Sequence, residues 1–299
     1  MAVALPVRHS FAPAGGRLFS VLQAVVRRPE GLFGFSVIVT LLLIAVFAPW
    51  ISPHDPAAQH ISDRLQGPSR EYPLGTDQLG RDLLSRIFYG TRVAFGVAIP
   101  AVAGALALGL VLGIAAGYFA GKVDNVLVVM FDTLQAFPTV ILALALIALL
   151  GPSLQNVIIV MIVSFAPAYG RVCRALVISV KQNLFVEAAR ALGASDARIA
   201  AVHIVPNILA PLRILLAMDI PSAIVVEAGL SFLGLGIQPP TPSWGSILSE
   251  GFSRVRDSPW PVLWAGLALM VTTLAFTMFS ERLSEVADPR LVVRHWRRP

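Results

Sequence analysis

The feature that most constrains this chain is a series of apolar stretches, each long enough to cross a lipid bilayer as a helix. Crossing the hydrocarbon core takes about 20 mainly apolar residues in helical conformation. Only 13% of the 299 residues are charged, whereas soluble domains carry roughly 25%, so the chain lacks the charged surface that a water-soluble fold needs. We therefore predict an all-α membrane protein with six transmembrane helices, over residues 31–51, 91–120, 126–150, 154–171, 208–235 and 261–280.

The distribution of basic residues predicts how these helices are oriented. With a cytoplasmic N-terminus, 16 of the 23 Lys and Arg side chains fall in cytoplasmic segments, in line with the positive-inside bias. An even number of spans then puts both termini in the cytoplasm. The net charge of +6 is accordingly interpreted as a topology signal and not as nucleic-acid binding. The first apolar stretch has no clear cleavage site after it, so we expect it to remain as a span.

The second predicted span carries a face of small residues. Gly109, Gly113 and Gly117 are spaced four apart and share one side of a helix. Such faces let two helix backbones approach closely in lipid. We expect this face to pack within the subunit, with a dimer seam as the less favoured alternative.

An interfacial helix is predicted in the loop before the second span, within residues 52–90. Thr76 is a plausible N-cap, and apolar residues recur at helical spacing after it. The pairs Asp77/Arg81 and Asp82/Arg86 are spaced i,i+4 and would lie on the polar side of this helix. This pattern alone indicates no particular function.

A long hydrophilic segment separates the fourth and fifth predicted spans. Within it, apolar residues form a stripe at helical spacing, after which Gly193 is placed to end the helix and Ser195 to cap a second short helix that Pro206 closes. The stripe consists of Leu184, Phe185, Ala188, Ala191 and Leu192. A helix–turn–helix with an apolar face outside the lipid needs a partner, either another protein or another part of this chain.

Three acidic residues fall inside predicted spans. Asp132, Asp219 and Glu227 would each cost roughly 2.5–3.5 kcal/mol at mid-bilayer, so we expect them to face the bundle interior or a water-filled path. A structural hydrogen bond to a neighbouring helix is the alternative, and for Glu227 the two roles are weighed equally. The segment 229–245 that follows is rich in Gly and Pro, and its apolar residues indicate that it packs against the protein.

Several of these segments together resemble one protein family. Glu187-Ala188-Ala189-x3-Gly193, followed by His203-Ile-Val-Pro206, is similar to the EAA signature of bacterial ABC importer permeases. Three further blocks resemble the C-type permeases of dipeptide, oligopeptide and nickel importers: Pro73-Leu-Gly-Thr-Asp-x-x-Gly-Arg-Asp-x-x-Ser-Arg86, Glu227-x-Gly-Leu-Ser-Phe-Leu-Gly-x-Gly-x-Gln-Pro-Pro240 and Asp288-Pro-Arg290. The stretch 280–285 departs from the usual family pattern. The resemblance covers roughly residues 31–290.

The resemblance implies a type I ABC importer permease fold and an organisation along the chain. It implies a cytoplasmic segment 1–30, a first transmembrane helix 31–51, an extracytoplasmic loop 52–90, a five-helix core 91–280 and a cytoplasmic tail 281–299. Within the core, 181–206 would be the coupling loop that docks on an ATPase. The residues implied in coupling are Glu187, Ala188, Ala189, Gly193, His203 and Pro206, and those implied in an outer gate or binding-protein contact are Gly236, Gln238, Pro239, Pro240 and Trp244.

The resemblance also implies partners and a location. The chain would sit in the bacterial inner membrane with a second, homologous permease subunit, two ABC ATPase subunits and an extracytoplasmic substrate-binding protein. It would hold no cofactor, because ATP and Mg²⁺ would bind the partner ATPases. Residues 116–123, the nearest approach to a Walker A motif, lack its first Gly and the Ser or Thr after Lys122.

A proton-coupled secondary transporter and an intramembrane enzyme are the alternatives to a non-catalytic permease subunit. A proton-coupled secondary transporter would use Asp132, Asp219 and Glu227 as carriers, but it leaves the segment around Glu187 unexplained. An intramembrane enzyme is disfavoured because the sequence has no His-Glu-x-x-His or Gly-x-Ser-x-Gly pattern, and its one cysteine, Cys173, builds no metal site. The permease is favoured. Its cargo, whether dipeptide, oligopeptide, nickel chelate or another small solute, is left open.

Overall fold

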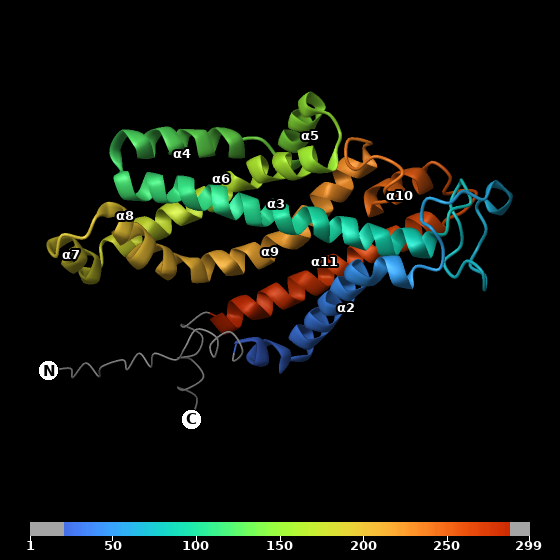
Figure 1. Cartoon of the computed structure of the whole chain (residues 1–299), viewed down its shortest axis with the longest axis horizontal. Coiled ribbons are helices and arrows are strands. Elements are labelled where there is room, and N and C mark those ends of the chain that lie inside the picture. Colours follow the sequence, from blue (N-terminus) through green and yellow to red (C-terminus); the bar gives the residue numbers. More distant parts are fainter. Residues whose placement is uncertain (1–20, 288–299) are drawn as a thin grey trace.

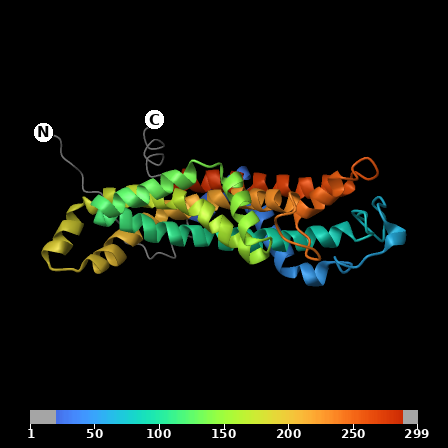
Figure 2. The ribbon, with the colours of Figure 1, turned by 90° about the horizontal axis from the view of Figure 1, so that it is seen from above.

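The computed structural model describes residues 21–287 as an elongated bundle of helices, with no strand among those residues (Figures 1 and 2). The basic residues expected in the terminal segments, such as Arg8 and Arg294, and the block 288–290 lie outside the described residues. The elements are α2 (Pro29–Ile51), η1 (Ile61–Asp63), α3 (Leu83–Phe119), α4 (Gly121–Gln135), α5 (Thr139–Leu150), α6 (Leu154–Lys181), α7 (Leu184–Ala191), α8 (Asp196–Arg198), the π-helical η2 (Ile199–Ile204), α9 (Val205–Phe232), α10 (Trp244–Phe252) and α11 (Trp260–Ala287).

Five helical segments are long and apolar enough to cross a membrane, and a sixth span is possible if the bent pair α4–α5 counts as one. The predicted third span, 126–150, is therefore not one straight helix. Its two halves meet at 93°, with α4 along the bundle and α5 across it (Figure 1). Pro138 causes the break, because it has an extended ψ of 132° and its ring cannot continue the helix that precedes it.

The helix α3 begins earlier than predicted and corrects the expected interfacial helix. It runs unbroken for 37 residues from Leu83, so the amphipathic stretch is its first turns and not a separate element. Thr76 is no N-cap. Asp82 caps α3 instead, with its carboxylate accepting from the Ser85 backbone N–H at 2.8 Å.

The face of small residues on α3 packs against α6 within the same chain, as predicted. A Cβ on Gly109 would lie 2.4 Å from the Cβ of Tyr169, one on Gly113 would lie 2.6 Å from that of Cys173, and one on Gly117 would meet Val177. Any side chain at these positions would force the two backbones apart. The glycines therefore make α3 and α6 a close-packed pair that forms the spine of the bundle.

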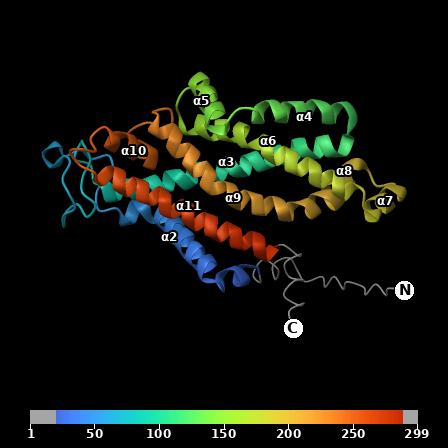
Figure 3. The ribbon, with the colours of Figure 1, turned by 180° about the vertical axis from the view of Figure 1, so that it is seen from behind.

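The helices α2 and α11 form a second close pair, seen from behind in Figure 3. A Cβ on Gly34 would lie 2.5 Å from the carbonyl oxygen of Ala275. Arg282 of α11 and Glu30 of α2 form an ion pair at 3.3 Å. The first span is thus attached to the rest of the bundle mainly through the last helix.

Candidate functional site

The segment from α7 through η2 forms one tip of the molecule, opposite the end that carries α10 (Figures 1 and 2). Its turn is built as the sequence predicts. Gly193 has a φ of +81°, and the backbone N–H groups of Gly193 and Ala194 donate to the carbonyls of Arg190 and Ala189 at 3.0 and 3.1 Å. This is the Schellman arrangement that favours glycine. Ser195 then caps α8 with a hydrogen bond of 3.4 Å from the Arg198 N–H.

The role predicted for Pro206 as the end of the second helix is wrong. The helix passes through η2 directly into α9, so that residues 196–232 form one helical segment. Pro206 lies in the first turn of α9, directly after the π-helical η2. The wider π turn just before it accommodates the ring, which would otherwise clash with the carbonyl four residues earlier.

This tip exposes large apolar side chains that a soluble surface would normally cover. Leu192 is 88% exposed and Leu184 is 81% exposed. Between α7 and η2 lies an open groove of about 520 Å³, lined by Phe185, Ala188, Ala189, Leu192, Gly193, Ala194, Arg198 and His203. Four of the six residues predicted for coupling therefore line one groove, and Glu187 is exposed on the same helix. An apolar concavity of this kind is typical of a protein-binding site.

The three acidic residues predicted for a pathway lie in three different settings. Asp132 accepts from Arg171 of α6 at 2.5 Å, and both side chains are about half exposed at the kink between α4 and α5. Asp219 lies on α9 beside the hydroxyl of buried Tyr169. Glu227 is buried and accepts from Ser231 Oγ at 2.7 Å. Sequence reasoning missed Arg171 as the partner of Asp132, because the two residues are 39 positions apart.

Glu227 anchors the loop that follows α9. Ser231 Oγ donates to Glu227 and accepts from the Ile237 backbone N–H at 3.2 Å. Gly236 is buried against Ser231, where a Cβ would lie 2.0 Å from Ser231 Oγ. The loop therefore packs against the protein, as its apolar residues predict.

Two residues predicted for an outer contact turn out to be interior. Trp244 is 1% exposed, donates from Nε1 to the Ile87 carbonyl at 3.1 Å and fills the space that the missing side chain of Gly90 leaves. Neither Trp244 nor Gly236 reaches the surface in this conformation, and their predicted place at an outer gate or binding-protein contact stays a prediction. Gln238, Pro239 and Pro240 are exposed and keep that predicted role.

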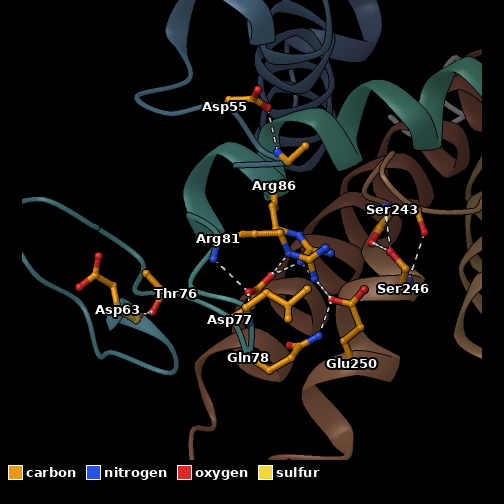
Figure 4. Close-up of polar contacts among 12 residues, drawn as sticks. Asp55, Asp63, Thr76, Asp77, Gln78, Arg81, Arg86, Ser243, Ser246 and Glu250 are labelled. Atoms are coloured by element: carbon orange, nitrogen blue, oxygen red, sulfur yellow. Dashed lines mark hydrogen bonds and ion pairs between the residues drawn. The ribbon is translucent and has the colours of Figure 1, made fainter. Parts of the chain in front are cut away.

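The opposite end of the bundle holds a buried network of charges (Figure 4). Asp77 Oδ2 accepts from Arg81 Nε at 2.6 Å and from Arg86 Nη1. Glu250 of α10 accepts from Arg81 at 2.6 Å, from Arg86 at 3.0 Å and from Gln78 at 3.0 Å. The predicted pair Asp77/Arg81 exists, but it lies in a loop and is buried, which corrects its expected place on a polar helix surface. Arg86 pairs with Asp77 and Glu250 instead of the predicted Asp82.

The comparisons with known proteins agree with this arrangement. Residues 109–293 match the model of the binding-protein-dependent transport system inner membrane component. Residues 20–68 match the model of the N-terminal transmembrane domain of oligopeptide transport permease C.

Individual relatives are similar over most of the chain. A dipeptide transport system permease protein of Alkalihalophilus pseudofirmus is 41% identical over 86% of this chain and 85% of its own length. A glutathione transport system permease protein of Pectobacterium atrosepticum is 37% identical over 90% and 89%. A nickel transport system permease protein of Escherichia coli K12 is 38% identical over 87% and 94%.

Proposed function

This chain belongs to the family of binding-protein-dependent transport system inner membrane components, and on that premise we propose that it forms half of the translocation pathway of an ATP-driven importer for peptides or a related small solute. As a member of this family it is a multi-pass inner-membrane permease component. The finer parts of the proposal are its coupling to separate ATPase subunits, its pairing with a second permease and its cargo.

The observation that carries the proposal is the apolar groove at the α7–η2 tip. Residues between Ala188 and His203, which match the EAA signature, line this groove, and the apolar side chains of Leu192 and Phe185 are exposed in it. Burying apolar surface is worth roughly 25 cal/mol per Å², so this tip gains affinity for an ATPase subunit when its exposed apolar side chains enter a cleft on that subunit. ATP and Mg²⁺ would bind that partner, and this chain would be non-catalytic.

The pathway is proposed to run past the kink between α4 and α5. Asp132 of α4 and Arg171 of α6 are both about half exposed near this kink, where α6 is long and apolar enough to cross a membrane and α4 belongs to the bent pair. Charged groups at that depth face water or protein and not lipid. A second permease subunit packed across this face would enclose the pair and complete a water-filled path between the two subunits.

The secondary-transport alternative fits the same residues less well. A proton carrier must exchange its proton with water on both sides in turn, whereas Glu227 is buried and hydrogen-bonded to Ser231. Asp132 accepts a hydrogen bond from Arg171 at 2.5 Å, so its carboxylate is already occupied by a partner within the chain. Neither arrangement supports alternating protonation.

Reconstitution tests the proposal directly. The chain, its companion permease, two ATPases and the binding protein are placed in vesicles, and uptake of a labelled dipeptide is followed with and without ATP. We expect uptake only with ATP and the ATPase subunits. Robust uptake by this chain alone on a proton gradient would contradict the permease proposal.

A single substitution tests whether the α7–η2 tip docks on an ATPase subunit. Glu187 is exposed and makes no side-chain hydrogen bond among residues 21–287, so Glu187→Arg should leave membrane insertion intact while it uncouples ATP hydrolysis from uptake. Normal coupled uptake by this variant would contradict docking at this segment.

The cargo is to be identified through the binding protein. Gln238, Pro239 and Pro240 are exposed at the α10 end, where delivery is proposed to occur. Co-purification of the binding protein, followed by mass spectrometry of its retained ligand, would separate peptides from nickel chelates.

A further inference from the structure

Tyr118 occupies a junction between the spine of the bundle and the α7–η2 tip. It lies in the last turn of α3, and its side chain is buried. Next to it, Gly117 brings α3 against α6, where a Cβ on Gly117 would lie 2.8 Å from that of Val177. Tyr118 therefore belongs to the most tightly packed part of the bundle, yet its hydroxyl points to the segment proposed to bind the ATPase.

Three separate elements make polar contacts with Tyr118. Its hydroxyl donates to Asp196 Oδ1 of α8 at 2.5 Å and accepts from Arg190 Nη2 of α7 at 3.5 Å. Lys181, at the end of α6, donates from Nζ to the Tyr118 carbonyl and lies 5.2 Å from the centre of its ring. A phenol bonded to a carboxylate is a charge-assisted hydrogen bond, the stronger class of such contacts.

These contacts are the main polar attachment of the tip. Within residues 21–287, every side-chain hydrogen bond that joins 184–198 to the long helices ends on the Tyr118 hydroxyl. The tip is also attached through the backbone, because α8 continues through η2 into α9, and through the apolar packing of Val186 and Ile199, which are buried. Apolar packing is non-directional and allows sliding, whereas a hydrogen bond fixes the orientation of its two groups.

The helix α3 reaches from this junction to the other end of the molecule. Its 37 residues correspond to about 55 Å at 1.5 Å per residue. Its first turn holds Arg86, which is bound in the charge network with Asp77 and Glu250. The helix is continuous over this length, with Pro100 in its interior, so a displacement that enters α3 at Tyr118 has a continuous helical connection to the α10 end.

We propose that Tyr118 is the positioning residue that transmits movement of the α7–α8 helices to α3, and through α3 to the outer end of the permease. The inference rests on the proposed function, because it assumes that an ATPase moves this tip. Tyr118 contacts neither nucleotide nor cargo in this scheme. It sets how far α3 turns for a given displacement of α8.

The test compares the number of dipeptides taken up per ATP hydrolysed in vesicles that contain the complete importer. A hydrogen bond to a charged group corresponds to roughly tenfold in an equilibrium constant, so Tyr118→Phe should lower this ratio by about tenfold while ATP hydrolysis continues. Tyr89→Phe is the matched control, since Tyr89 lies on the same helix and its hydroxyl has no hydrogen bond to other residues within 21–287. It should keep the wild-type ratio.

Asp196 provides a second variant and a conservative rescue. Asp196 is exposed, so Asp196→Ala should fold and still lower the ratio. Asp196→Asn keeps an oxygen that accepts from the phenol and should restore most of it. Tyr118→Phe combined with Asp196→Ala should be no worse than Tyr118→Phe alone, because Tyr118→Phe already removes the contact with Asp196.

The outcomes separate this inference from the function on which it rests. An unchanged ratio in Tyr118→Phe, with an active wild-type complex, overturns the inference alone. Equal losses of uptake, ATP hydrolysis and complex yield, with the ratio unchanged, also overturn it and assign Tyr118 a purely structural role. Absence of ATP-dependent uptake by the wild-type complex overturns the proposed function and the inference with it.

Discussion

The two ends of this bundle are both polar in sequence, but they are built in opposite ways. At the α10 end, Asp77, Arg81 and Arg86 are buried and form ion pairs with one another and with the partly buried Glu250. At the α7–η2 end, the polar residues face outward and the apolar side chains of Leu184 and Leu192 are left exposed. The charged groups at the α10 end are paired with one another, whereas the apolar side chains at the α7–η2 end are left uncovered.

This difference indicates what each end is for. The charges of the α10 network are paired within the chain, so removing one of them should lower the stability of the fold. An exposed apolar groove is incomplete within the chain, so changes there should be felt in association with a partner and hardly at all in stability. The predictions below test this division, from the largest expected effect to the smallest.

Removing the Arg86 side chain should destabilise the charge network at the α10 end. Arg86→Ala leaves Asp77 and Glu250 with Arg81 as their only cationic partner in a buried site, and uncompensated buried charge costs about 3–5 kcal/mol. The expected result is a large drop in the thermal unfolding temperature in detergent. Arg92→Ala, on the same helix but exposed, is the control and should melt like the wild type; a normal melting temperature for Arg86→Ala would mean that the network contributes nothing.

A charge placed in the groove at the α7–η2 end should weaken ATPase binding without unfolding the protein. Leu192→Asp should weaken the binding of ATPase subunits by at least about tenfold, since anchors buried at interfaces contribute roughly 1–2 kcal/mol or more. Stability should change by less than about 0.5 kcal/mol, because Leu192 is 88% exposed. Pull-down of the ATPase at graded concentrations measures the first quantity, and thermal unfolding measures the second.

The same charge outside the groove is the matched control for Leu192→Asp. Ala197 is exposed on α8 and does not line the groove, so Ala197→Asp should weaken ATPase binding much less. Equal losses from both variants would assign the effect to charge at the tip in general and not to the apolar groove.

A substitution of Gly193 should lower stability through backbone strain alone. A Cβ there meets nothing within 4 Å, but φ is +81°, so Gly193→Ala should cost about 1 kcal/mol through the strained conformation. Gly266→Ala in α11 also has open space around the Cβ and no positive φ, so it should be neutral or slightly stabilising. If the two variants unfold at the same temperature, the turn is not held in its left-handed conformation.

The smallest effect is expected at a charged pair that is not buried. Arg254 and Asp257, near the α10 end, lie 3.7 Å apart and are each more than half exposed. Arg254→Ala should change stability by less than about 0.5 kcal/mol. A loss comparable to that of Arg86→Ala would show that position at the α10 end matters more than burial does, against the division drawn here.

Local features of the site were predicted well from the sequence. The turn at Gly193, the cap at Ser195 and the apolar stripe from Leu184 to Leu192 depend on neighbours within a few residues, and the structure confirms them. The family inferred from the signature blocks is confirmed by the comparisons. The prediction for Pro206 failed because the sequence shows a helix-breaking residue but does not show the π turn that accommodates it.

Features that depend on distant partners were missed. Glu250 was not singled out, since its partner Arg81 is 169 positions away. Trp244 was assigned to an outer gate or binding-protein contact from the resemblance, and its burial against Gly90 and the Ile87 carbonyl, 157 positions away, was missed. Tyr118 carries no local signal, because its partner Asp196 is 78 positions away.

The sequence by itself determined that this chain is a helical membrane protein, which family it belongs to and where the glycine turn of the α7–η2 tip lies, because hydrophobic run length and glycine and cap spacing act over short distances. Only the tertiary structure decided which charges are buried together, that α4 and α5 meet at a bend of 93°, and that one hydroxyl on α3 holds the α7–α8 tip. These depend on which helices become neighbours, and in this bundle the close approach of α3 and α6 sets that arrangement.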